Sequence, residues 1–348
     1  MLASPPVRMK ILRQLAALAP QTAACIGAFD GFHLGHQALL RRAAQLETNL
    51  AVVTFDPHPA QVLAPERAPP LLQTTRQRER VCAELGVDAL VLLPFDQAMA
   101  RMSPENFVRG VLVEGLQAAT IVVGPDFRFG AGRRGGVSEL RALLQQHAPG
   151  VRLELAEEIP CPTARAGDDG KLSSTGIRSA VRRGEMAAVL PMLGRWFAIA
   201  GTVVRGAQRG RTLGFPTANL RCGAVIQPRA GVYAAALTVI DERSPLFEQR
   251  WPAVANLGTN PTFTKAASPG GLSLEVHALE MDPGASLYDL EVEVSFVERL
   301  RDEQRFSGPE ALRAQIALDV ERARTLLTPE ALARARAQPL RQRRERSA

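Results

Sequence analysis

The sequence GAFDGFHLGH, residues 27–36, places three glycines and two of the chain's five histidines between an apolar run and a stretch of helical character. The apolar run at 23–26 predicts a buried strand, and residues 36–46 carry apolar side chains at helical spacing. Glycines after a strand let backbone N–H groups approach a phosphate, and the start of the next helix adds a positive potential. The stretch therefore predicts a phosphate-binding loop at one edge of a parallel sheet.

Outward from this loop, apolar runs alternate with helical stretches up to about residue 160. The predicted strands are 23–26, 51–55, 89–93, 120–123 and 151–159, and the predicted helices are 36–46, 75–85, 104–114 and 137–147. Strands that are apolar throughout and separated by helices are typical of a parallel sheet covered on both faces. We expect a doubly wound, Rossmann-like α/β domain that binds ligands beyond the carboxyl ends of its strands.

After residue 190 the pattern changes to closely spaced strands with turns rich in glycine and proline. The predicted strands are 197–204, 231–240, 251–256, 272–279 and 290–297. This spacing predicts an antiparallel barrel or sandwich. A helix closes the domain in SGPEALRAQIALDVERARTLL, residues 307–327, where Ser307 is the expected N-cap and Glu310 has capping-box spacing.

The length of 348 residues favours two domains, and the change of pattern puts the boundary near residue 185. We expect domains at 1–185 and 186–328, followed by a basic, frayed tail at 329–348. Of the net charge of +7, residues 332–348 supply +5 through six arginines and one glutamate, which leaves about +2 elsewhere. A nearly neutral body lacks the basic stripe of a nucleic-acid groove, so no nucleic-acid partner is expected.

Hydropathy and cysteine usage indicate the compartment. The chain has no run of about 18 apolar residues, so no membrane span or membrane partner is expected. Proline and charge interrupt the first twenty residues too often for a signal peptide. Four cysteines lie far apart without metal-ligand spacing, which suits a protein of the reducing cytoplasm.

The two histidines of the opening stretch, His33 and His36, lie three residues apart at the expected helix start. Imidazoles in that place can donate hydrogen bonds to phosphate oxygens and to charge that develops in a transition state. The alternative is a glycine-rich turn with two capping histidines. Their position directly after the first strand favours the phosphate-binding interpretation.

The HxGH pattern at 33–36 resembles a signature of the nucleotidylyltransferase superfamily. A second superfamily signature is similar to SSTGIRSAVRRG, residues 173–184, which offers hydroxyl groups and an arginine at a helix start. The resemblance implies an ATP site formed by both signatures, with His33, His36 and Arg178 as catalytic groups. The ATP-binding residues that it implies are Gly27, Phe29, His33, His36, Ser173, Ser174, Thr175 and Arg178.

Two further stretches narrow this resemblance. TFDPHP, residues 54–59, ends the second strand, and GPDFRFGAGRRGG, residues 124–136, follows the fourth. Together with the two signatures they resemble the FMN adenylyltransferase module of bacterial bifunctional riboflavin kinase/FAD synthetases. The flavin-binding residues implied are Phe55, Pro57, His58, Asp126, Phe127 and Phe129. The GxGxxG pattern at 130–135 would suggest an NAD site. In that motif the first glycine directly follows the strand, and here it does not, so an NAD site is not favoured.

The C-terminal half resembles the riboflavin kinase module of the same family. GFPTANL, residues 214–220, matches its signature, in which Thr217 and Asn219 would hold Mg²⁺ and ATP phosphates. These two residues alternate, so both side chains can point to one side of an extended segment. The resemblance also implies ATP-binding roles for Gly201, Gly210 and Gly214.

In LEVHAL, residues 274–279, the resemblance makes Glu275 the catalytic base for the riboflavin hydroxyl; without it, a solvent-facing strand carboxylate is the simpler interpretation. One departure from the family pattern is Gly176, where a larger residue is more usual. The implied function is phosphorylation of riboflavin to FMN with Mg²⁺ and ATP, followed by adenylylation of FMN to FAD. Alternatives are a nucleotidylyltransferase for another acceptor, such as phosphopantetheine, and a flavin-binding protein with inactive sites. Self-association is left open.

Overall fold

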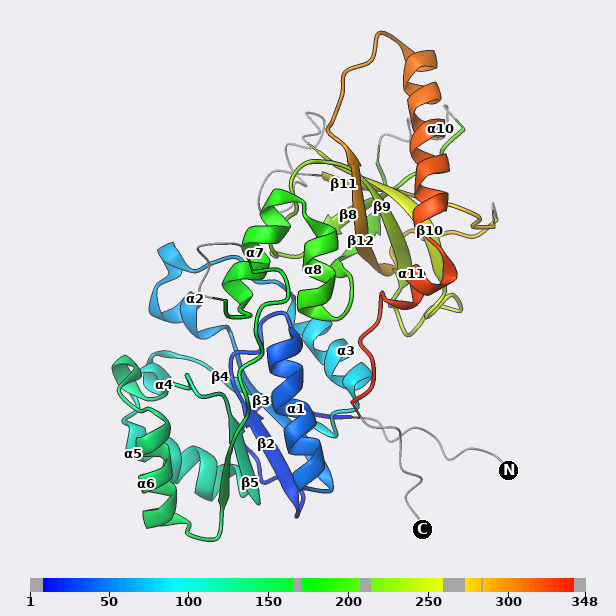
Figure 1. Cartoon of the computed structure of the whole chain (residues 1–348). Helices are drawn as coiled ribbons and strands as arrows, with labels where there is room; N and C mark the ends of the chain where they lie inside the picture. The colour runs from blue at the N-terminus through cyan, green and yellow to red at the C-terminus, as the bar shows by residue number, and fades with distance from the viewer. Residues whose placement is uncertain (1–8, 165–169, 207–213, 259–272, 283, 341–348) are drawn as a thin grey trace, which may run out of the picture. The chain divides into compact units, whose positions relative to one another are not determined.

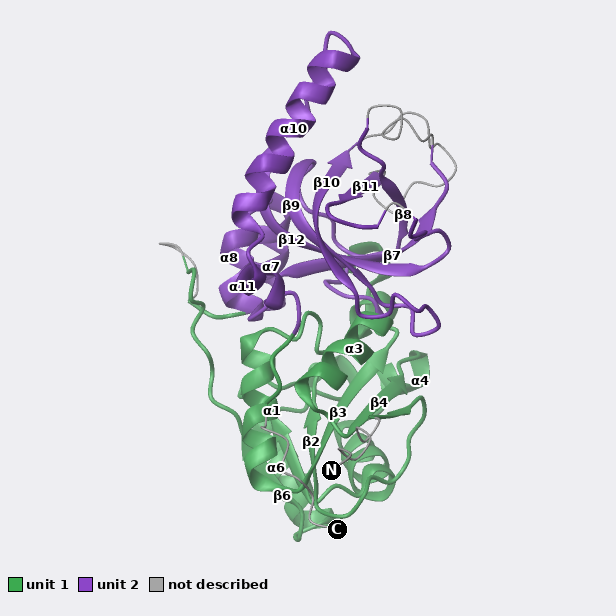
Figure 2. Ribbon diagram, turned by 90° about the vertical axis from the view of Figure 1, so that its right-hand side faces the viewer, with its two compact units in different colours: residues 1–69, 75–172, 337–348 green, residues 70–74, 173–336 purple. Residues whose placement is uncertain are grey.

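The computed structural model describes residues 9–164, 170–206, 214–258, 273–282 and 284–340 (Figure 1). The chain forms two compact units, coloured separately in Figure 2. Unit 1 comprises residues 1–69, 75–172 and 337–348, and unit 2 comprises residues 70–74 and 173–336. The predicted boundaries at 185 and 328 stay predictions.

Unit 1 contains a six-stranded parallel sheet with the order β1-β4-β3-β2-β5-β6. Its strands are β1 (Lys10–Leu12), β2 (Thr22–Ile26), β3 (Asn49–Asp56), β4 (Ala89–Pro94), β5 (Thr120–Val123) and β6 (Arg152–Leu155). Its helices are α1 (Leu34–Leu46), α2 (Pro59–Leu63), η1 (Pro65–Arg67), α3 (Thr75–Leu85), α4 (Gln97–Arg101), α5 (Pro104–Asn106), η2 (Phe107–Leu116), η3 (Ala131–Arg133) and α6 (Val137–His147). The prediction of a parallel α/β domain is confirmed.

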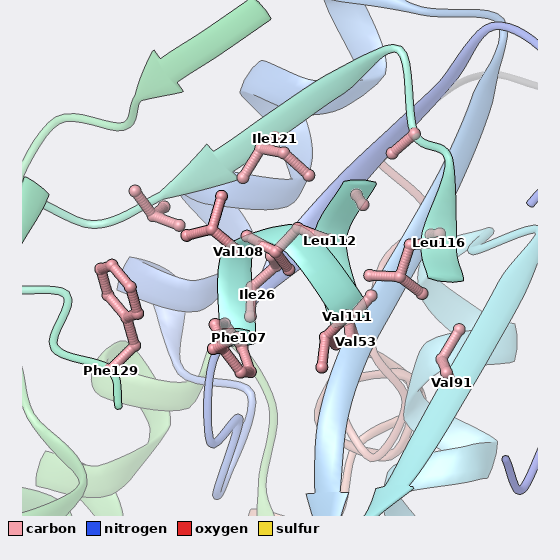
Figure 3. Packing of buried hydrophobic residues seen from close by; sticks show 14 of the residues in the cluster. Ile26, Val53, Val91, Phe107, Val108, Val111, Leu112, Leu116, Ile121 and Phe129 are labelled. Carbon is pink, nitrogen blue, oxygen red and sulfur yellow. The ribbon is translucent and has the colours of Figure 1, made fainter. Parts of the chain in front are cut away.

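Helices cover both faces of this sheet, so its strands are apolar on both sides. In β2, Ala24 and Ile26 pack with η2 and α6, whereas Ala23 and Cys25 pack with α1 and α3. Figure 3 shows the first of these cores, where Val108 and Leu112 of η2 lie against the sheet. The alternation of side chains along a strand therefore explains why the predicted strands read as unbroken apolar runs.

Two elements of unit 1 differ from expectation. The helix predicted at 104–114 is a short α-helix that continues as the π-helix η2 and ends before Gln117, which has a left-handed backbone. Apolar spacing does not distinguish α from π winding, because five apolar residues of η2 are buried in either case. The strand predicted at 151–159 ends at Leu155.

Unit 2 contains a closed barrel of the described strands, all antiparallel, in the order β10-β11-β8-β7-β12-β9. The strands are β7 (Phe197–Val204), β8 (Ala218–Cys222), β9 (Gly231–Val239), β10 (Arg250–Gly258), β11 (Ser273–Ala278) and β12 (Glu291–Arg301). The helices are α7 (Ser174–Arg183), α8 (Met186–Leu193), α10 (Pro309–Leu326) and α11 (Pro329–Ala333). This confirms the expected barrel with a C-terminal helix.

The expected N-cap of the closing helix is wrong by one residue. α10 begins at Pro309, its N-cap is Gly308 and no side chain caps it, so Ser307 does not form the predicted capping box. Proline at the first helical position disfavours a helical backbone at the preceding residue. Gly308 is fully extended, with a φ of −179°, and therefore stands at the helix boundary in place of Ser307.

The expectation of a frayed tail is wrong for residues 332–340. The carbonyl of Leu332 accepts a hydrogen bond from Arg250, at 2.9 Å, and that of Arg334 accepts one from the Trp196 backbone, at 3.0 Å. Further on, the backbone of Ala337 donates to the Glu84 carboxylate, at 2.9 Å. Although the tail is basic in composition, backbone groups of residues 332–340 therefore form hydrogen bonds with other parts of the fold. Within the described ranges, no helix is both long and apolar enough to cross a membrane.

Candidate active sites

The loop after β2 is folded around two phenylalanines. Phe29 and Phe32 are fully buried and their rings stack at 5.3 Å, although both have a positive φ, of 45° and 41°. Such a backbone costs about 1–3 kcal/mol for a bulky residue, and burial of a phenylalanine side chain contributes about as much. The Gln37 amide donates to the Phe32 carbonyl at 2.9 Å. The loop is thus held by its own aromatic packing.

His33 is the N-cap of α1. Its Nδ1 accepts from the His36 backbone N–H at 3.4 Å, a long hydrogen bond, and its ring stacks on that of His36 at 3.7 Å. A side chain at Gly35 would lie 3.0 Å from this Nδ1, which explains the glycine between the two histidines. The Nδ1 of His33 therefore caps α1, as the capping alternative expects. The role of the two histidines in phosphate binding stays a prediction.

His36 sits against the two loop phenylalanines. Its ring centroid is 5.0 Å from that of Phe29 and 6.3 Å from that of Phe32. Its buried Nδ1 has no hydrogen-bond partner in the described part of the chain. Burial, and secondly the charge of His33, hold the pKa of His36 well below its ordinary value of 6.5. The imidazole is therefore neutral near pH 7, with one N–H to donate and one nitrogen that accepts.

The segment after β3 carries three of the predicted flavin residues. Phe55 is half-buried and its ring meets that of Phe95 edge to face, at 5.4 Å. His58 caps α2: its side chain accepts from the Ala60 backbone at 3.2 Å, and Gln61 accepts from the His58 backbone. Pro57, between them, is exposed. Phe55 is the second-last residue of β3, and Pro57 and His58 follow the carboxyl end of this strand.

Sequence reasoning missed Arg78, which fixes the start of this segment. Arg78 lies on α3 and is 2% exposed. It donates to the Phe55 carbonyl at 3.1 Å and to the Thr75 hydroxyl at 3.0 Å, and lies 3.5 Å from the Asp56 carboxylate. In the sequence it is one of several charged residues of a helix, so no local signal distinguishes it.

The segment after β5 brings the other predicted flavin residues together. The rings of Phe127 and Phe129 stack at 5.6 Å, and Phe129 also contacts Phe107. Phe129 is only 6% exposed and belongs to the core, whereas Phe127 is half-buried and Asp126 is exposed. Of the two rings, Phe127 is therefore the more accessible.

The second signature begins α7. Ser173 is the N-cap and its hydroxyl accepts from the Gly176 backbone at 3.2 Å, so the expected helix start is present. Arg178 is 7% exposed, and its Nε donates to the Pro70 carbonyl at 2.8 Å. Ser174 and Thr175 form the first turn. By its contacts α7 belongs to unit 2, whereas the histidine loop belongs to unit 1. That both bind one ATP stays a prediction.

In unit 2 the barrel brings together two residues that are 56 positions apart in the sequence. Asn219 of β8 and Glu275 of β11 are direct partners in the antiparallel ladder. Directly opposite residues present their side chains on the same face of a sheet, roughly 5 Å apart at Cβ. Sequence analysis assigned each to the kinase site separately, and the strand register now pairs them.

A second residue that sequence reasoning missed is Gly206, just after β7. A Cβ at this position would lie 2.3 Å from the side-chain nitrogen of Asn219, so only glycine fits. Of the predicted ATP-binding glycines, Gly214 has a φ of +86° and Gly201 lies inside β7 against the Arg221 carbonyl. Gly210 lies outside the described residues.

Two family models match the chain. The FAD synthetase model matches residues 16–161, and the riboflavin kinase model matches residues 193–327. Apart from residues 70–74, the first match lies in the parallel α/β unit, and the barrel lies within the second. Fold and matches together define a two-domain transferase of flavin nucleotide synthesis.

Curated relatives extend over almost the whole chain. A bifunctional riboflavin kinase/FMN adenylyltransferase of Pseudomonas fluorescens is 38% identical over 333 residues, which cover 93% of this chain and 99% of the relative. That of Escherichia coli K12 is 38% identical over 324 residues, which cover 91% and 97%. The chain belongs to the bifunctional riboflavin kinase/FMN adenylyltransferase family.

A solved structure has the same fold over both units. A crystal structure described as a macrolide-efflux protein from Streptococcus pneumoniae is 27% identical, with a TM-score of 0.74, and covers 91% of this chain and 99% of its own. Its description differs from that of the curated relatives. The likeness supports the fold, and the family assignment rests on the sequence matches.

The low pKa of His36 predicts a pH dependence of stability. Below about pH 6.5 the unfolded chain binds a proton at this histidine that the folded chain does not, so stability falls as the pH falls. We expect His36→Leu to reduce this slope by at most about 1.4 kcal/mol per pH unit. Urea unfolding of both proteins at pH 7.0 and 5.5, followed by circular dichroism, measures it. If the free energy of unfolding depended on pH equally in both proteins, His36 would not be a buried, neutral histidine.

Gly206→Ala tests the packing against Asn219. The added methyl group must displace the Asn219 amide, so we expect riboflavin phosphorylation to fall at least tenfold, a change of about 1.4 kcal/mol, while adenylylation of supplied FMN continues. Gly284→Ala is the matched control, because a Cβ there meets no atom closer than 3.4 Å. Equal kinase rates for the two variants would argue against the close approach.

Proposed function

We propose the following division of chemistry in this bifunctional riboflavin kinase and FMN adenylyltransferase. The domain at 186–328 phosphorylates riboflavin with ATP to give FMN. The domain at 1–185 transfers AMP from a second ATP to FMN, which gives FAD and pyrophosphate. The order and position of the two family matches support this division.

Adenylyl transfer needs little acid–base chemistry. A phosphate oxygen of FMN attacks the α-phosphorus of ATP, the bond to the β-phosphate oxygen breaks, and pyrophosphate leaves. Because the attacking oxygen is already ionised, catalysis rests on positioning and on stabilising charge at the α-phosphate. We assign these tasks to His33, His36 and Arg178, with ATP contacts from Gly27, Phe29 and the hydroxyls that begin α7. The neutral state of His36 supports a hydrogen-bond donor there.

The flavin of FMN is assigned to the segments that follow β3 and β5. Phe55, Pro57 and His58 come from the first segment, and Asp126, Phe127 and Phe129 come from the second. The half-buried rings of Phe55 and Phe127 can stack on a flavin, and Phe129 supports Phe127 from within the core.

Riboflavin phosphorylation is assigned to the face of the β8–β11 ladder that carries Asn219 and Glu275. Glu275 takes the proton of the ribityl 5′-hydroxyl while the hydroxyl oxygen bonds to the γ-phosphorus of ATP. The bond between the γ-phosphorus and the bridging oxygen breaks, and ADP leaves with its electrons. The observation that carries this assignment is the direct pairing of Glu275 with Asn219. Asp241 is a poor alternative base, because its hydrogen bond with Arg243 lowers its pKa to about 2.

The side-chain oxygens of Thr217 and Asn219 are suitable ligands for Mg²⁺. Thr217 and Asn219 offer neutral oxygen atoms, which suit a hard cation that brings much of its coordination from nucleotide phosphates and water. The described residues contain no cluster of three or more His, Cys, Asp or Glu side chains that could hold a metal by themselves. When bound with ATP, the cation would neutralise charge on the phosphates. We further assign Gly201, Gly210 and Gly214 to ATP binding.

We also propose a cytoplasmic location. None of the four cysteines, which all lie among the described residues, forms a disulfide bond, as expected of a protein from a reducing compartment. The partners assigned to the protein are its small-molecule substrates, and nothing in either site requires a nucleic acid.

The double variant His33→Ala/His36→Ala tests the adenylyl transfer site. A donor directed at transition-state charge contributes about 2.7–4 kcal/mol, so FAD formation from supplied FMN should fall by about 10²–10³-fold or more. Riboflavin phosphorylation should continue. Flavins from a reaction with ATP and Mg²⁺ are separated and measured. His147→Ala, on α6, is the control, and unchanged FAD formation in the double variant would leave the histidines as helix caps only.

Glu275→Gln tests the kinase base. The amide keeps the size of the side chain but removes its basicity, so kcat for FMN formation should fall about 10²–10⁴-fold while substrates still bind. Adenylylation of supplied FMN should continue at its normal rate, because that activity is assigned to the other domain. Glu280→Gln, an exposed carboxylate just beyond β11, is the matched control. A rate equal to that of the control would exclude Glu275 as the base.

A further inference from the structure

His277 lies on β11 two residues after Glu275, and its ring contacts the segment that precedes Thr217. Its Nδ1 is 2.8 Å from the Pro216 carbonyl oxygen, and its ring meets that of Phe215 edge to face, at 5.5 Å and 89°. A carbonyl oxygen only accepts, so Nδ1 carries the proton in this contact. The tautomer of His277 follows from its partner.

The backbone ladder cannot hold this segment. The last described partners of β8 and β11 on this side are Ala218 and Val276, so the next pair in register would be Thr217 and His277. Pro216 has no N–H to donate, and regular pairing ends before it. Beyond the end of the ladder, the side chain of His277 donates a hydrogen bond to the carbonyl of Pro216, the residue before Thr217.

Thr217 therefore lies between two fixed points. On one side Ala218 is paired in the β8–β11 ladder, and on the other side Pro216 is held by His277. Phe215, half-buried against the cluster around Trp196, limits the movement of the segment further. A side chain between two restrained neighbours has a defined direction.

We propose that His277 is a positioning residue of the kinase site, which orients Thr217 toward the phosphates of the Mg²⁺–ATP complex. The proposal rests on the role assigned to Thr217 above. The contacts of His277 are with Pro216 and Phe215, so we expect its effect to reach the reaction through Thr217. Loss of one such hydrogen bond should change nucleotide binding by about two- to tenfold.

Two substitutions separate the hydrogen bond from the ring. His277→Phe keeps an aromatic ring against Phe215 but removes the donor, whereas the side-chain nitrogen of His277→Asn can occupy nearly the place of Nδ1. We expect the phenylalanine variant to raise the KM for Mg²⁺–ATP about two- to tenfold at saturating riboflavin, with a smaller effect on kcat. In the His277→Asn variant, the KM for Mg²⁺–ATP should return most of the way to its value in the unsubstituted protein. Ser244→Ala, which removes another side-chain hydrogen bond in the same unit, is the control.

A purely structural role predicts a different result. It would lower the thermal midpoint of both His277 variants and leave KM equal to that of the control, and this outcome would overturn the proposal. Equal KM increases in both variants would also overturn it, because the donor would then be irrelevant. FMN adenylylation, measured on the same preparations, shows that the adenylyltransferase domain is intact, and the thermal midpoint reports on the fold of each variant.

Thr217→Val separates this proposal from the one on which it rests. If Thr217→Val phosphorylates riboflavin with normal KM for Mg²⁺–ATP, the assigned role of Thr217 is wrong, and the positioning proposal is overturned with it. If Thr217→Val is impaired while His277→Phe is normal, only the role of His277 is wrong. If both raise KM and His277→Asn does not, the proposal is supported.

Discussion

Burial of the parallel sheet on both faces is the constraint on which the chemistry of unit 1 depends. Every residue of β2 is buried, and alternate side chains enter different cores. Such strands have no room for a charged catalytic group along their length, because an unpaired buried charge is costly. The candidate residues therefore lie where strands end: His33 and His36 after β2, Phe55 to His58 at the end of β3 and just after it, and Asp126 to Phe129 after β5.

The barrel of unit 2 has the opposite arrangement. Its candidate residues Asn219 and Glu275 lie within strands, between buried neighbours such as Leu220 and Leu274. Antiparallel strands have one face that packs and one that can stay accessible, so a polar side chain can alternate with apolar ones. The same physical rule thus puts one candidate site at strand ends and the other on a strand surface.

In both units, backbone positions are held by side-chain contacts and not by strand pairing alone. Phe29 and Phe32 stabilise a strained loop, Arg78 holds the end of β3, and His277 holds the Pro216 carbonyl. Arg78 and His277 are far from their partners in the sequence: Arg78 and Phe55 are separated by 23 residues, and His277 and Pro216 by 61. Both act on residues that the family motifs contain, but neither was assigned to a site from those motifs.

The sequence by itself determined the classes of the two folds: apolar runs separated by helices are typical of a parallel α/β sheet, and closely spaced strands with turns are typical of an antiparallel barrel or sandwich. It also identified most candidate residues, since these lie in short motifs such as HxGH and PTAN. It could not determine the π winding of η2, the N-cap of α10 or the contacts of residues 332–340, which depend on local geometry and on distant partners. Only the tertiary structure decided that Glu275 faces Asn219, that Gly206 must lack a side chain and that His36 is neutral, because register, close approach and desolvation arise when distant segments pack together.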